Sequence, residues 1–404
     1  KHEVIRVTAL TTGSEAWWQS KSGPDLKPEN GKFRVTFWWR DPNGTQTSSP
    51  IKHVWLNITG VTDHHQNARP QSLKRIPDTD VWQWEGEFSP AWRGSYCFIP
   101  SVNENDFADA VFEGESPDRI ALREGWGKLL PHAVSDPLNP QSWRGGRGHA
   151  VSALEMPGAP VQPGWDRPDT PHHAPVCIDW ESARLKNRRR VWIFTTGEEN
   201  PERPLAVLLD GQFWAESMPV WPALAALTRE GKLPPAVYVL IDVIDTAHRS
   251  RELPCNPDFW LAVQEELLPQ IQRIAPFSDR ADRTVAAGQS FGGLSSLYAG
   301  LNWPQRFGCV LSQSGSYWWP HRGAQQEGLL IGQLKAGEKT ARGLRIVLEA
   351  GRNEPLIFRV NQAIYAELHA QQVYWRQVDG GHDALCWRGG LTQGLMTLWQ
   401  PLIQ

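Results

Sequence analysis

Residues 288–292 form a Gly-x-Ser-x-Gly motif with Ser290 at its centre. The motif follows the apolar run 285–287 and precedes residues 294–299, which favour a helix, so it lies where a strand turns into a helix. A sharp turn of this kind presents a serine hydroxyl to a base and an oxyanion site, and glycines on both sides allow the strand and helix to close on each other. We therefore predict that Ser290 is a catalytic nucleophile rather than an ordinary turn serine.

Three histidines follow Ser290 and are candidates for its base: His321, His369 and His382. His369 falls late in a predicted amphipathic helix, and His321 follows a Trp-Trp-Pro run near the next strand as a competitor. His382 lies in the glycine-rich segment 378–383, directly after the last predicted strand. A base must lie there to reach a nucleophile at the carboxyl edge of the sheet. We predict that His382 is the base.

The acid that orients the base is expected after the strand predicted over 344–348. Glu354 lies beyond the turn glycine of that loop and precedes a helix, so we prefer it. Glu349 is still at the strand end and is the alternative. Asp383 neighbours the histidine, where the short connection disfavours a hydrogen bond to Nδ1. A Ser–His dyad without a fixed acid remains a further possibility.

An oxyanion site in this arrangement uses the backbone N–H that follows the nucleophile, here that of Phe291. A second N–H comes from the loop after an early strand. That loop covers 208–214 and includes Gly211, which permits a tight turn, and we predict that Gln212 supplies the donor. An ordinary β-turn at Asp210-Gly211 is the alternative.

The elements that must position these residues alternate between strand and helix from about residue 176. Predicted strands cover 190–194, 205–209, 236–241, 284–287, 309–311, 344–348 and 373–378, and the clearest helices cover 259–274 and 358–368. This alternation is typical of a mostly parallel sheet with helices on both faces. The chain order serine, acid, histidine then predicts an α/β hydrolase domain over residues 176–404.

The first 150 residues have a different pattern. Short strands are predicted over 33–39, 53–58, 81–88 and 94–100, with turn residues between them. This spacing predicts an all-β, immunoglobulin-like sandwich domain over 1–150. Residues 156–175 contain six prolines, which exclude helix and inner strand, so we predict a linker over 151–175. A long surface loop inside one domain is the alternative.

Composition excludes several classes of function. The formal net charge of −3 gives no reason to expect nucleic acid as a partner, and no apolar run approaches a membrane span. The 5 cysteines are odd in number, widely spaced and without a C-x-x-C motif, which argues against a disulfide framework and against a zinc site. We therefore expect a cytoplasmic protein with no metal and no cofactor. Most of the 22 tryptophans fall in strand-like runs and are expected in the core.

Four segments of the second half resemble the esterase D-like branch of the α/β hydrolases, which includes feruloyl esterases, mycolyltransferases and siderophore esterases. These segments are 209–212, 288–293, 351–354 and 380–383. The first half is similar to the domain that precedes the hydrolase in bacterial enterobactin (enterochelin) esterases, in segments 82–87, 95–100 and 136–140. The resemblance covers essentially the whole chain, and the two-domain combination is far more specific than the serine motif alone.

The resemblance implies a substrate and the residues that contact it. The substrate is ferric enterobactin, a cyclic trilactone of 2,3-dihydroxybenzoylserine, so iron would enter as part of the substrate. An arginine in an Arg-x-x-acidic segment contacts the catecholate in the family, and Arg249 maps onto it. Nearby His248 and Arg251 would add positive potential towards an anionic complex. Trp214 and Trp387 are expected either to pack on the catechol rings or to belong to the core.

The sequence departs from this branch in one position, because Glu354 stands where aspartate is frequent. Two enzymes of the same fold remain as alternatives: a feruloyl or carbohydrate esterase, which would be secreted, and an acyltransferase that prefers a sugar hydroxyl to water. A binding protein that kept the fold without the chemistry is a third, disfavoured by the intact serine and histidine motifs.

Overall fold

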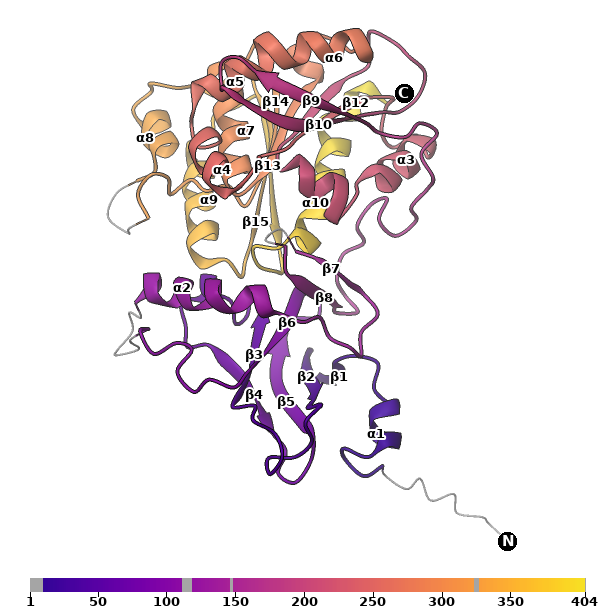
Figure 1. Ribbon diagram of the computed structural model, residues 1–404. Helices are drawn as coiled ribbons and strands as arrows, with labels where there is room; N and C mark the ends of the chain where they lie inside the picture. The colour runs from indigo at the N-terminus through magenta and orange to yellow at the C-terminus, as the bar shows by residue number, and fades with distance from the viewer. Residues whose placement is uncertain (1–9, 111–117, 146–147, 323–326, 404) are drawn as a thin grey trace. The chain divides into compact units, whose positions relative to one another are not determined.

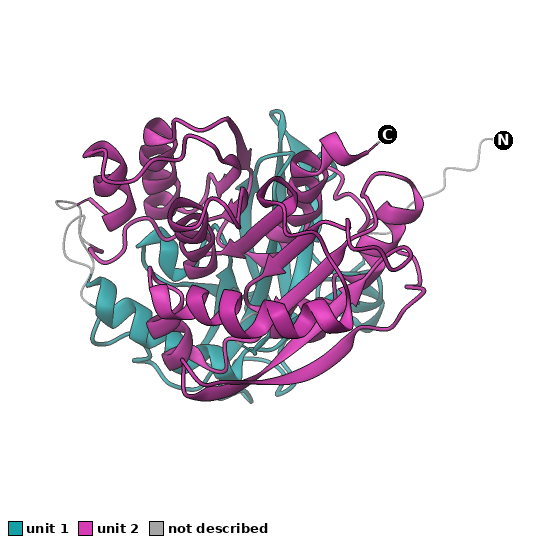
Figure 2. Ribbon diagram, turned by 90° about the horizontal axis from the view of Figure 1, so that it is seen from above, with its two compact units in different colours: residues 1–159 teal, residues 160–404 magenta. Residues whose placement is uncertain are grey.

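The computed structural model of the chain describes residues 10–110, 118–145, 148–322 and 327–403. The chain divides into two compact units, Lys1–Ala159 and Pro160–Gln404, drawn in different colours in Figure 2. The boundary between the units falls inside the segment predicted as a linker, 151–175. The first residues of that segment form a strand instead, because Ala150–Glu155 pairs with an earlier strand of the first unit.

The first unit is an all-antiparallel β domain. Its strands are β1 (Asp25–Glu29), β2 (Lys32–Arg40), β3 (His53–Ile58), β4 (Gln71–Arg75), β5 (Val81–Phe88), β6 (Arg93–Ser101), β7 (Ser142–Arg144) and β8 (Ala150–Glu155). They are hydrogen-bonded in the order β1-β2-β5-β4-β3-β6-β8-β7. The described residues of the unit also form two α-helices, α1 (Glu15–Gln19) and α2 (Arg119–Leu129), and two 3₁₀ turns, His64–Gln66 and Leu130–His132. All four predicted strands are present, at β2, β3, β5 and β6.

One apolar core joins the two halves of this sheet. Alternate residues of β2, such as Val35 and Phe37, are buried with Val54 and Leu56 of β3 and Phe98 of β6. This alternation leaves the other face of β2 partly exposed, as expected when one face of an antiparallel sheet covers a core. The predicted all-β domain is therefore confirmed, and β4 connects its two halves by pairing with both β3 and β5.

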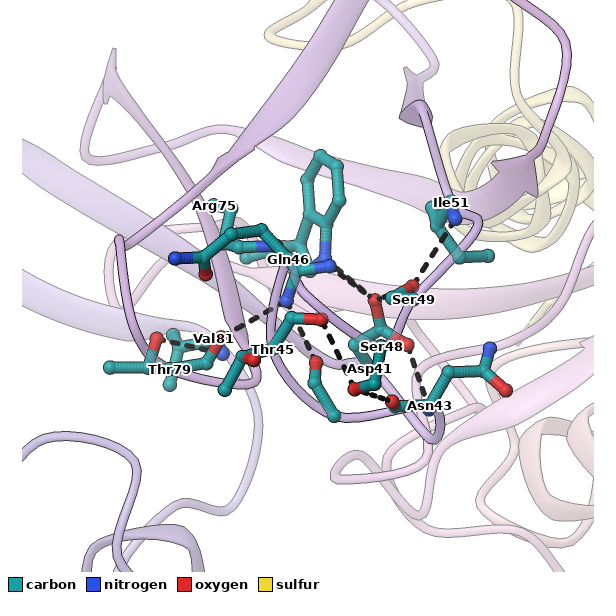
Figure 3. A network of polar contacts seen from close by, with 12 residues as sticks. Asp41, Asn43, Thr45, Gln46, Ser48, Ser49, Ile51, Arg75, Thr79 and Val81 are labelled. Carbon is teal, nitrogen blue, oxygen red and sulfur yellow. Dashed lines mark hydrogen bonds and ion pairs between the residues drawn. The ribbon is translucent and has the colours of Figure 1, made fainter.

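A buried ion pair stabilises one end of this domain (Figure 3). Arg75 Nη2 lies 2.6 Å from Asp41 Oδ2, and the Asp41 side chain is fully buried. Ser49 Oγ and the Trp82 indole N–H also donate to the Asp41 carboxylate, at 2.5 and 3.3 Å. Burial raises the pKa of Asp41, but the hydrogen bonds from Ser49, Asn43, Arg75 and Trp82 outweigh it and leave the pKa below its ordinary value.

Asp41→Asn is expected to destabilise this domain by about 3 kcal/mol near neutral pH, because it leaves the Arg75 guanidinium without its counter-charge. The lowered pKa means that the wild-type contribution is present above the ordinary aspartate pKa of about 4 and disappears as pH falls through the folded-state value. The difference in the free energy of unfolding between Asp41→Asn and the wild type should therefore become smaller at acidic pH. Urea unfolding followed by tryptophan fluorescence at about pH 7 and about pH 3 measures both effects. Glu85→Gln, which removes the exposed Arg34 ion pair, is the control and should cost less than about 1 kcal/mol.

The second unit contains a mostly parallel sheet. Its strands are β9 (Val176–Ser182), β10 (Asn187–Thr195), β11 (Leu205–Leu208), β12 (Val237–Ile241), β13 (Thr284–Gln289), β14 (Cys309–Gln313), β15 (Arg345–Gly351) and β16 (Gln372–Val378). Their order is β16-β15-β14-β13-β11-β12-β10-β9, with β9 and β10 antiparallel and the rest parallel. Every residue of β11, β12, β13 and β14 is buried, as expected for strands covered on both faces.

Helices cover both faces of this sheet. They are α3 (Trp221–Arg229), α4 (Thr246–Glu252), α5 (Pro257–Ala262), α6 (Leu268–Ile274), α7 (Phe291–Asn302), α8 (Leu329–Lys335), α9 (Pro355–Glu367) and α10 (Ala384–Leu398). Figure 1 shows α3 and α10 on one face and α7 and α9 on the other. The predicted α/β hydrolase domain is confirmed.

The helix predicted over 259–274 is interrupted. A π-helical turn, Val263–Leu267, separates α5 from α6, and Pro269 lies in the first turn of α6. Proline has no N–H to donate to the preceding turn, so the widened turn accommodates the missing hydrogen bond. A second π-helical segment, Phe213–Ser217, follows the loop after β11.

The proline-rich segment that opens the second unit packs on α10. Gln162 Nε2 donates to the carbonyl of Leu385, and the Trp165 indole N–H donates to the carbonyl of Arg388. The hydroxyl of Thr392 donates to the carbonyl of Pro163. These hydrogen bonds fix residues 162–165 on the hydrolase, so this stretch behaves as part of that unit. Among the described helices of the whole chain, none is both long and apolar enough to cross a bilayer.

Candidate active site

Ser290 lies at a strained turn between β13 and α7. Its backbone has φ 60° and ψ −123°, a combination that L-residues rarely adopt. The turn is held by the Ser290 N–H, which donates to the carbonyl of Gln313 at 3.0 Å. A Cβ on Gly288 would lie 2.4 Å from the backbone of Gly292, so only glycine fits at the first motif position. This is the geometry predicted for an exposed nucleophile.

His382 is held by a buried carboxylate. Its Nδ1 lies 2.5 Å from Glu354 Oε1, and the Glu354 side chain is fully buried. The other two candidate bases, His321 and His369, lie on the surface. The structure therefore brings together the predicted base and the preferred acid.

Three donors surround the Glu354 carboxylate. Oε2 accepts hydrogen bonds from Ser314 Oγ at 2.6 Å and from the Gly351 N–H at 2.7 Å, while Oε1 faces His382. Burial raises the pKa of Glu354 to about 8, although the bonds from Ser314 and Gly351 lower it. Ser314 and Gly351 therefore hold the carboxylate with Oε1 directed at the Nδ1 atom of His382.

The alternative acids have other partners. Glu349 Oε2 accepts from Gln313 Nε2 at 2.8 Å, and Glu349 Oε1 lies 3.2 Å from Arg376 Nε. Burial raises the pKa of Glu349 to about 7. Asp383 caps α10 by accepting the Leu385 N–H. Of the three carboxylates, Glu354 is the one that the structure places on the Nδ1 atom of His382.

Sheet order explains why these residues meet. Ser290, Glu354 and His382 follow β13, β15 and β16, whose carboxyl ends lie at one edge of the sheet. Strand β14 lies between β13 and β15. The residues that follow β14 contact residues that follow each of these two neighbouring strands. Ser314 reaches Glu354, and Ser316 Oγ lies 3.4 Å from Ser290 Oγ. Sequence reasoning missed both serines, although polar residues at the end of an otherwise buried strand were an available signal.

The loop predicted to complete the oxyanion site follows β11, the neighbour of β13. It forms a helical turn in which the Phe213 N–H donates to the carbonyl of Asp210. A Cβ on Gly211 would lie 2.5 Å from the backbone of Ile241, so this loop packs closely on β12. Gln212 and Phe291 each lie at the start of a helical segment, and both segments begin at the same edge of the sheet. The backbone N–H groups at the start of a helix favour a negatively charged group nearby.

Arg249 connects this loop to the nucleophile strand. Its Nε and Nη2 atoms donate to the two carboxylate oxygens of Asp210, at 2.9 and 3.0 Å, and Nη2 also donates to the carbonyl of Gln289. Its guanidinium lies over the Phe291 ring. A bidentate guanidinium–carboxylate pair is geometrically rigid, so Arg249 orients the loop after β11 with respect to Ser290.

Comparisons with known proteins cover nearly the whole chain. The family described as "Enterochelin esterase, N-terminal" matches residues 34–165, and the family described as "Putative esterase" matches residues 182–398. The iron(III) enterobactin esterase of Escherichia coli K12 is 68% identical over 400 residues, covering 98% of this chain and 99% of the relative. The chain belongs to the iron(III) enterobactin esterase family. The resemblance predicted from the sequence is therefore confirmed.

Solved structures of this esterase family agree with that assignment. The crystal structure of the ferric enterobactin esterase from Salmonella typhimurium is 69% identical and has a TM-score of 0.93, with 96% of this chain and 99% of that chain covered. The enterobactin esterase from Shigella flexneri, crystallised in the presence of enterobactin, is 67% identical with a TM-score of 0.88 and covers 98% of this chain. The match also covers 100% of the Shigella flexneri chain.

The structure distinguishes the other four residues that were predicted to bind substrate. Trp214 is only 1% exposed, and its indole N–H donates to Gln289 Oε1, which favours the core alternative over packing on a catechol ring. Trp387 is partly exposed and packs its ring against His382. His248 Nδ1 lies 2.8 Å from Asp245, the residue that caps α4, whereas Arg251 is exposed on the same helix.

Arg249→Ala is expected to lower kcat/KM for ferric enterobactin by about 10- to 100-fold, because it leaves the Asp210 carboxylate unpaired beside the nucleophile turn. Arg251→Ala is the matched control, since Arg251 is on the same helix and exposed. It should stay within about 3-fold, with its effect reduced by added salt. Steady-state kinetics on both variants tests this. Equal losses in the two variants would mean that α4 contributes only general positive charge.

Proposed function

We propose that this chain is a serine esterase that hydrolyses the backbone esters of ferric enterobactin to linear 2,3-dihydroxybenzoylserine trimer, dimer and monomer. The observation that carries the proposal is the buried Glu354–His382 pair at the sheet edge that also presents Ser290. Serine ester hydrolysis needs a nucleophile on a sharp turn, a base and a group that orients the base. All these residues lie in 176–404, to which we assign the whole of the chemistry.

The proposed reaction has two acyl-transfer steps. Ser290 Oγ attacks an ester carbonyl of the trilactone while His382 accepts the hydroxyl proton, and the N–H groups of Phe291 and Gln212 hold the oxyanion. His382 then protonates the departing serine hydroxyl of the substrate. Water, deprotonated by the same histidine, hydrolyses the acyl-enzyme and regenerates Ser290. Glu354 keeps the Nδ1 proton of His382 in place and stabilises the imidazolium that forms at each step.

The chain's relatives support this substrate. Four relatives that are 40% to 68% identical are named iron(III) enterobactin esterases, and a fifth, 28% identical, is named an iron(III) salmochelin esterase. Hydrolysis would cut the preorganised ring and so weaken its hold on iron. Iron takes part only as a component of the substrate in this proposal. We place the reaction in the cytoplasm, since the five cysteines of the chain are odd in number, widely spaced and without a C-x-x-C motif, which fits a reducing compartment.

The test is chromatography of ferric enterobactin after incubation with the full-length protein. The expected result is the successive appearance of linear trimer, dimer and monomer. An unchanged trilactone, together with rapid cleavage of feruloyl esters, would overturn the substrate and favour a carbohydrate esterase of the same fold. Transfer of an acyl group to added sugar in preference to water would favour an acyltransferase.

A further inference from the structure

Ser314 is the first residue after β14, and its hydroxyl makes two hydrogen bonds within the site. It donates to Glu354 Oε2 at 2.6 Å and accepts from the Trp387 indole N–H at 2.9 Å. The residue is 1% exposed. A hydroxyl has one proton to donate, so donation to Glu354 leaves its lone pairs for Trp387, and the direction of both bonds is set.

Both partners of Ser314 contact the base. Glu354 Oε1 lies 2.5 Å from His382 Nδ1. The Trp387 ring packs edge to face with the His382 ring, at a centroid distance of 4.8 Å and an interplanar angle of 85°. One hydroxyl therefore fixes the hydrogen-bond partner of the imidazole and also the aromatic wall beside it.

The backbone of Ser314 is held as firmly as its side chain. Its φ is 49°, in the left-handed region, and its N–H donates to the carbonyl of Glu349 at 2.7 Å. Two residues later the Ser316 N–H donates to the carbonyl of Ser290. A residue keeps such a conformation only where its surroundings impose it, so the segment after β14 is a fixed connection between the nucleophile turn and the acid.

The hydrogen bond from Ser314 affects the charge of the acid. A donor aimed at a carboxylate favours its ionised form, and the Ser314 hydroxyl lowers the pKa of Glu354 against the effect of burial. The charged groups that face Glu354 are His382 and, on β15, Glu349, whose proximity disfavours two negative charges. Ser314 thus favours the charge state in which Glu354 supports His382 as a base.

We propose that Ser314 is a positioning residue of the catalytic site, which orients Glu354 directly and His382 through Glu354 and Trp387. The inference rests on the proposed function, since it deepens the role of the same site. A buried serine with a purely structural role would affect only the stability of the protein. A positioning role for Ser314 predicts, in addition, that its removal changes kcat and the pH dependence of kcat.

The experiment compares Ser314→Ala with Ser312→Ala in the full-length protein. Ser312 is buried in β14, and its hydroxyl pairs with the Tyr317 hydroxyl at 2.6 Å rather than with Glu354 or His382. Ser314→Ala is expected to lower kcat by about 10- to 100-fold, as for loss of a hydrogen bond to a charged group, with KM within about 2-fold. The acid limb of its pH profile should move to higher pH. Ser312→Ala should leave kcat and the pH profile unchanged.

Two further variants show whether Ser314 acts on His382 through Glu354 or through Trp387. Trp387→Phe keeps the ring beside His382 but removes the donor to Ser314, and should lower kcat less than Ser314→Ala does. In a Glu354→Gln background, Ser314→Ala should cause little additional loss, because residues that act as a unit are not additive. A full additional loss in that background would overturn the proposal, as would a loss of kcat without any movement of the pH profile.

A measurement that does not use ferric enterobactin tests the role of Ser314 separately from the proposed substrate. The rate at which a fluorophosphonate labels Ser290 reports activation of the serine by His382. Slower labelling of Ser314→Ala, with its pH dependence displaced, supports the positioning role even if ferric enterobactin is not cleaved. Equal labelling of wild type and Ser314→Ala at every pH overturns it. Thermal unfolding of each variant confirms that the compared proteins are folded.

Discussion

Ser290→Ala is expected to lower kcat for ferric enterobactin by about 10⁴- to 10⁶-fold, the range seen when the nucleophile of a serine hydrolase is removed. Without the hydroxyl, no acyl-enzyme forms, and His382 has no proton to accept. The fold should be unaffected, since alanine keeps the Cβ at the strained turn. Chromatography of the products measures the loss, and mass spectrometry should show that the variant no longer takes up one fluorophosphonate group.

Ser296→Ala is the matched control for this prediction. Ser296 is a buried serine of α7, the helix that follows β13, and its hydroxyl donates to the carbonyl of Gly292 in the same helix. Its loss should change kcat by less than about 3-fold and affect stability instead. Retained hydrolysis in Ser290→Ala would show that another group performs the nucleophilic attack.

Glu354→Gln is expected to lower kcat by about 10³- to 10⁴-fold with little change in KM, as observed when the acid of a serine triad becomes an amide. An amide has the same shape but no charge. It therefore fails to stabilise the imidazolium of His382, and its NH₂ group can turn towards Nδ1 and favour the wrong tautomer. The measurement is the ratio of kcat values at a pH on the plateau of the wild-type profile.

Glu349→Gln provides the control, because Glu349 lies five residues earlier and is equally buried. Its carboxylate faces Arg376 and Gln313 rather than His382, so the change should lower stability while kcat stays within about 3-fold. A larger loss in Glu349→Gln than in Glu354→Gln would reverse the two assignments. Comparable small losses would favour the Ser–His dyad that the sequence left open.

Most strands that carry the site could be predicted because their signal is local. Strands β11 to β15 contain continuous apolar runs, and β16 is an alternating edge strand. Ser290, Gln212 and His382 follow three of these strands. Three of the strands that were missed, β1, β4 and β9, have weak patterns. β1 and β9 are mostly exposed edge strands, and β4 buries only Leu73 fully, so neighbouring strands rather than their own composition stabilise them. The helix α2 was missed because two glycines interrupt its apolar residues and only three of its residues are buried.

The sequence by itself determined the class of chemistry, because a nucleophile turn, a glycine-flanked histidine and their chain order are recorded in short motifs. It also determined the two-domain family. Tertiary structure decided which carboxylate meets His382, since Glu349 and Glu354 are both near the end of β15 and only the path of the loop separates them. It also decided that Trp214 is buried, that Arg249 holds Asp210, and that Ser314 reaches the acid. These are contacts between residues distant in the chain, and their distances depend on how parallel strands align at one edge of the sheet.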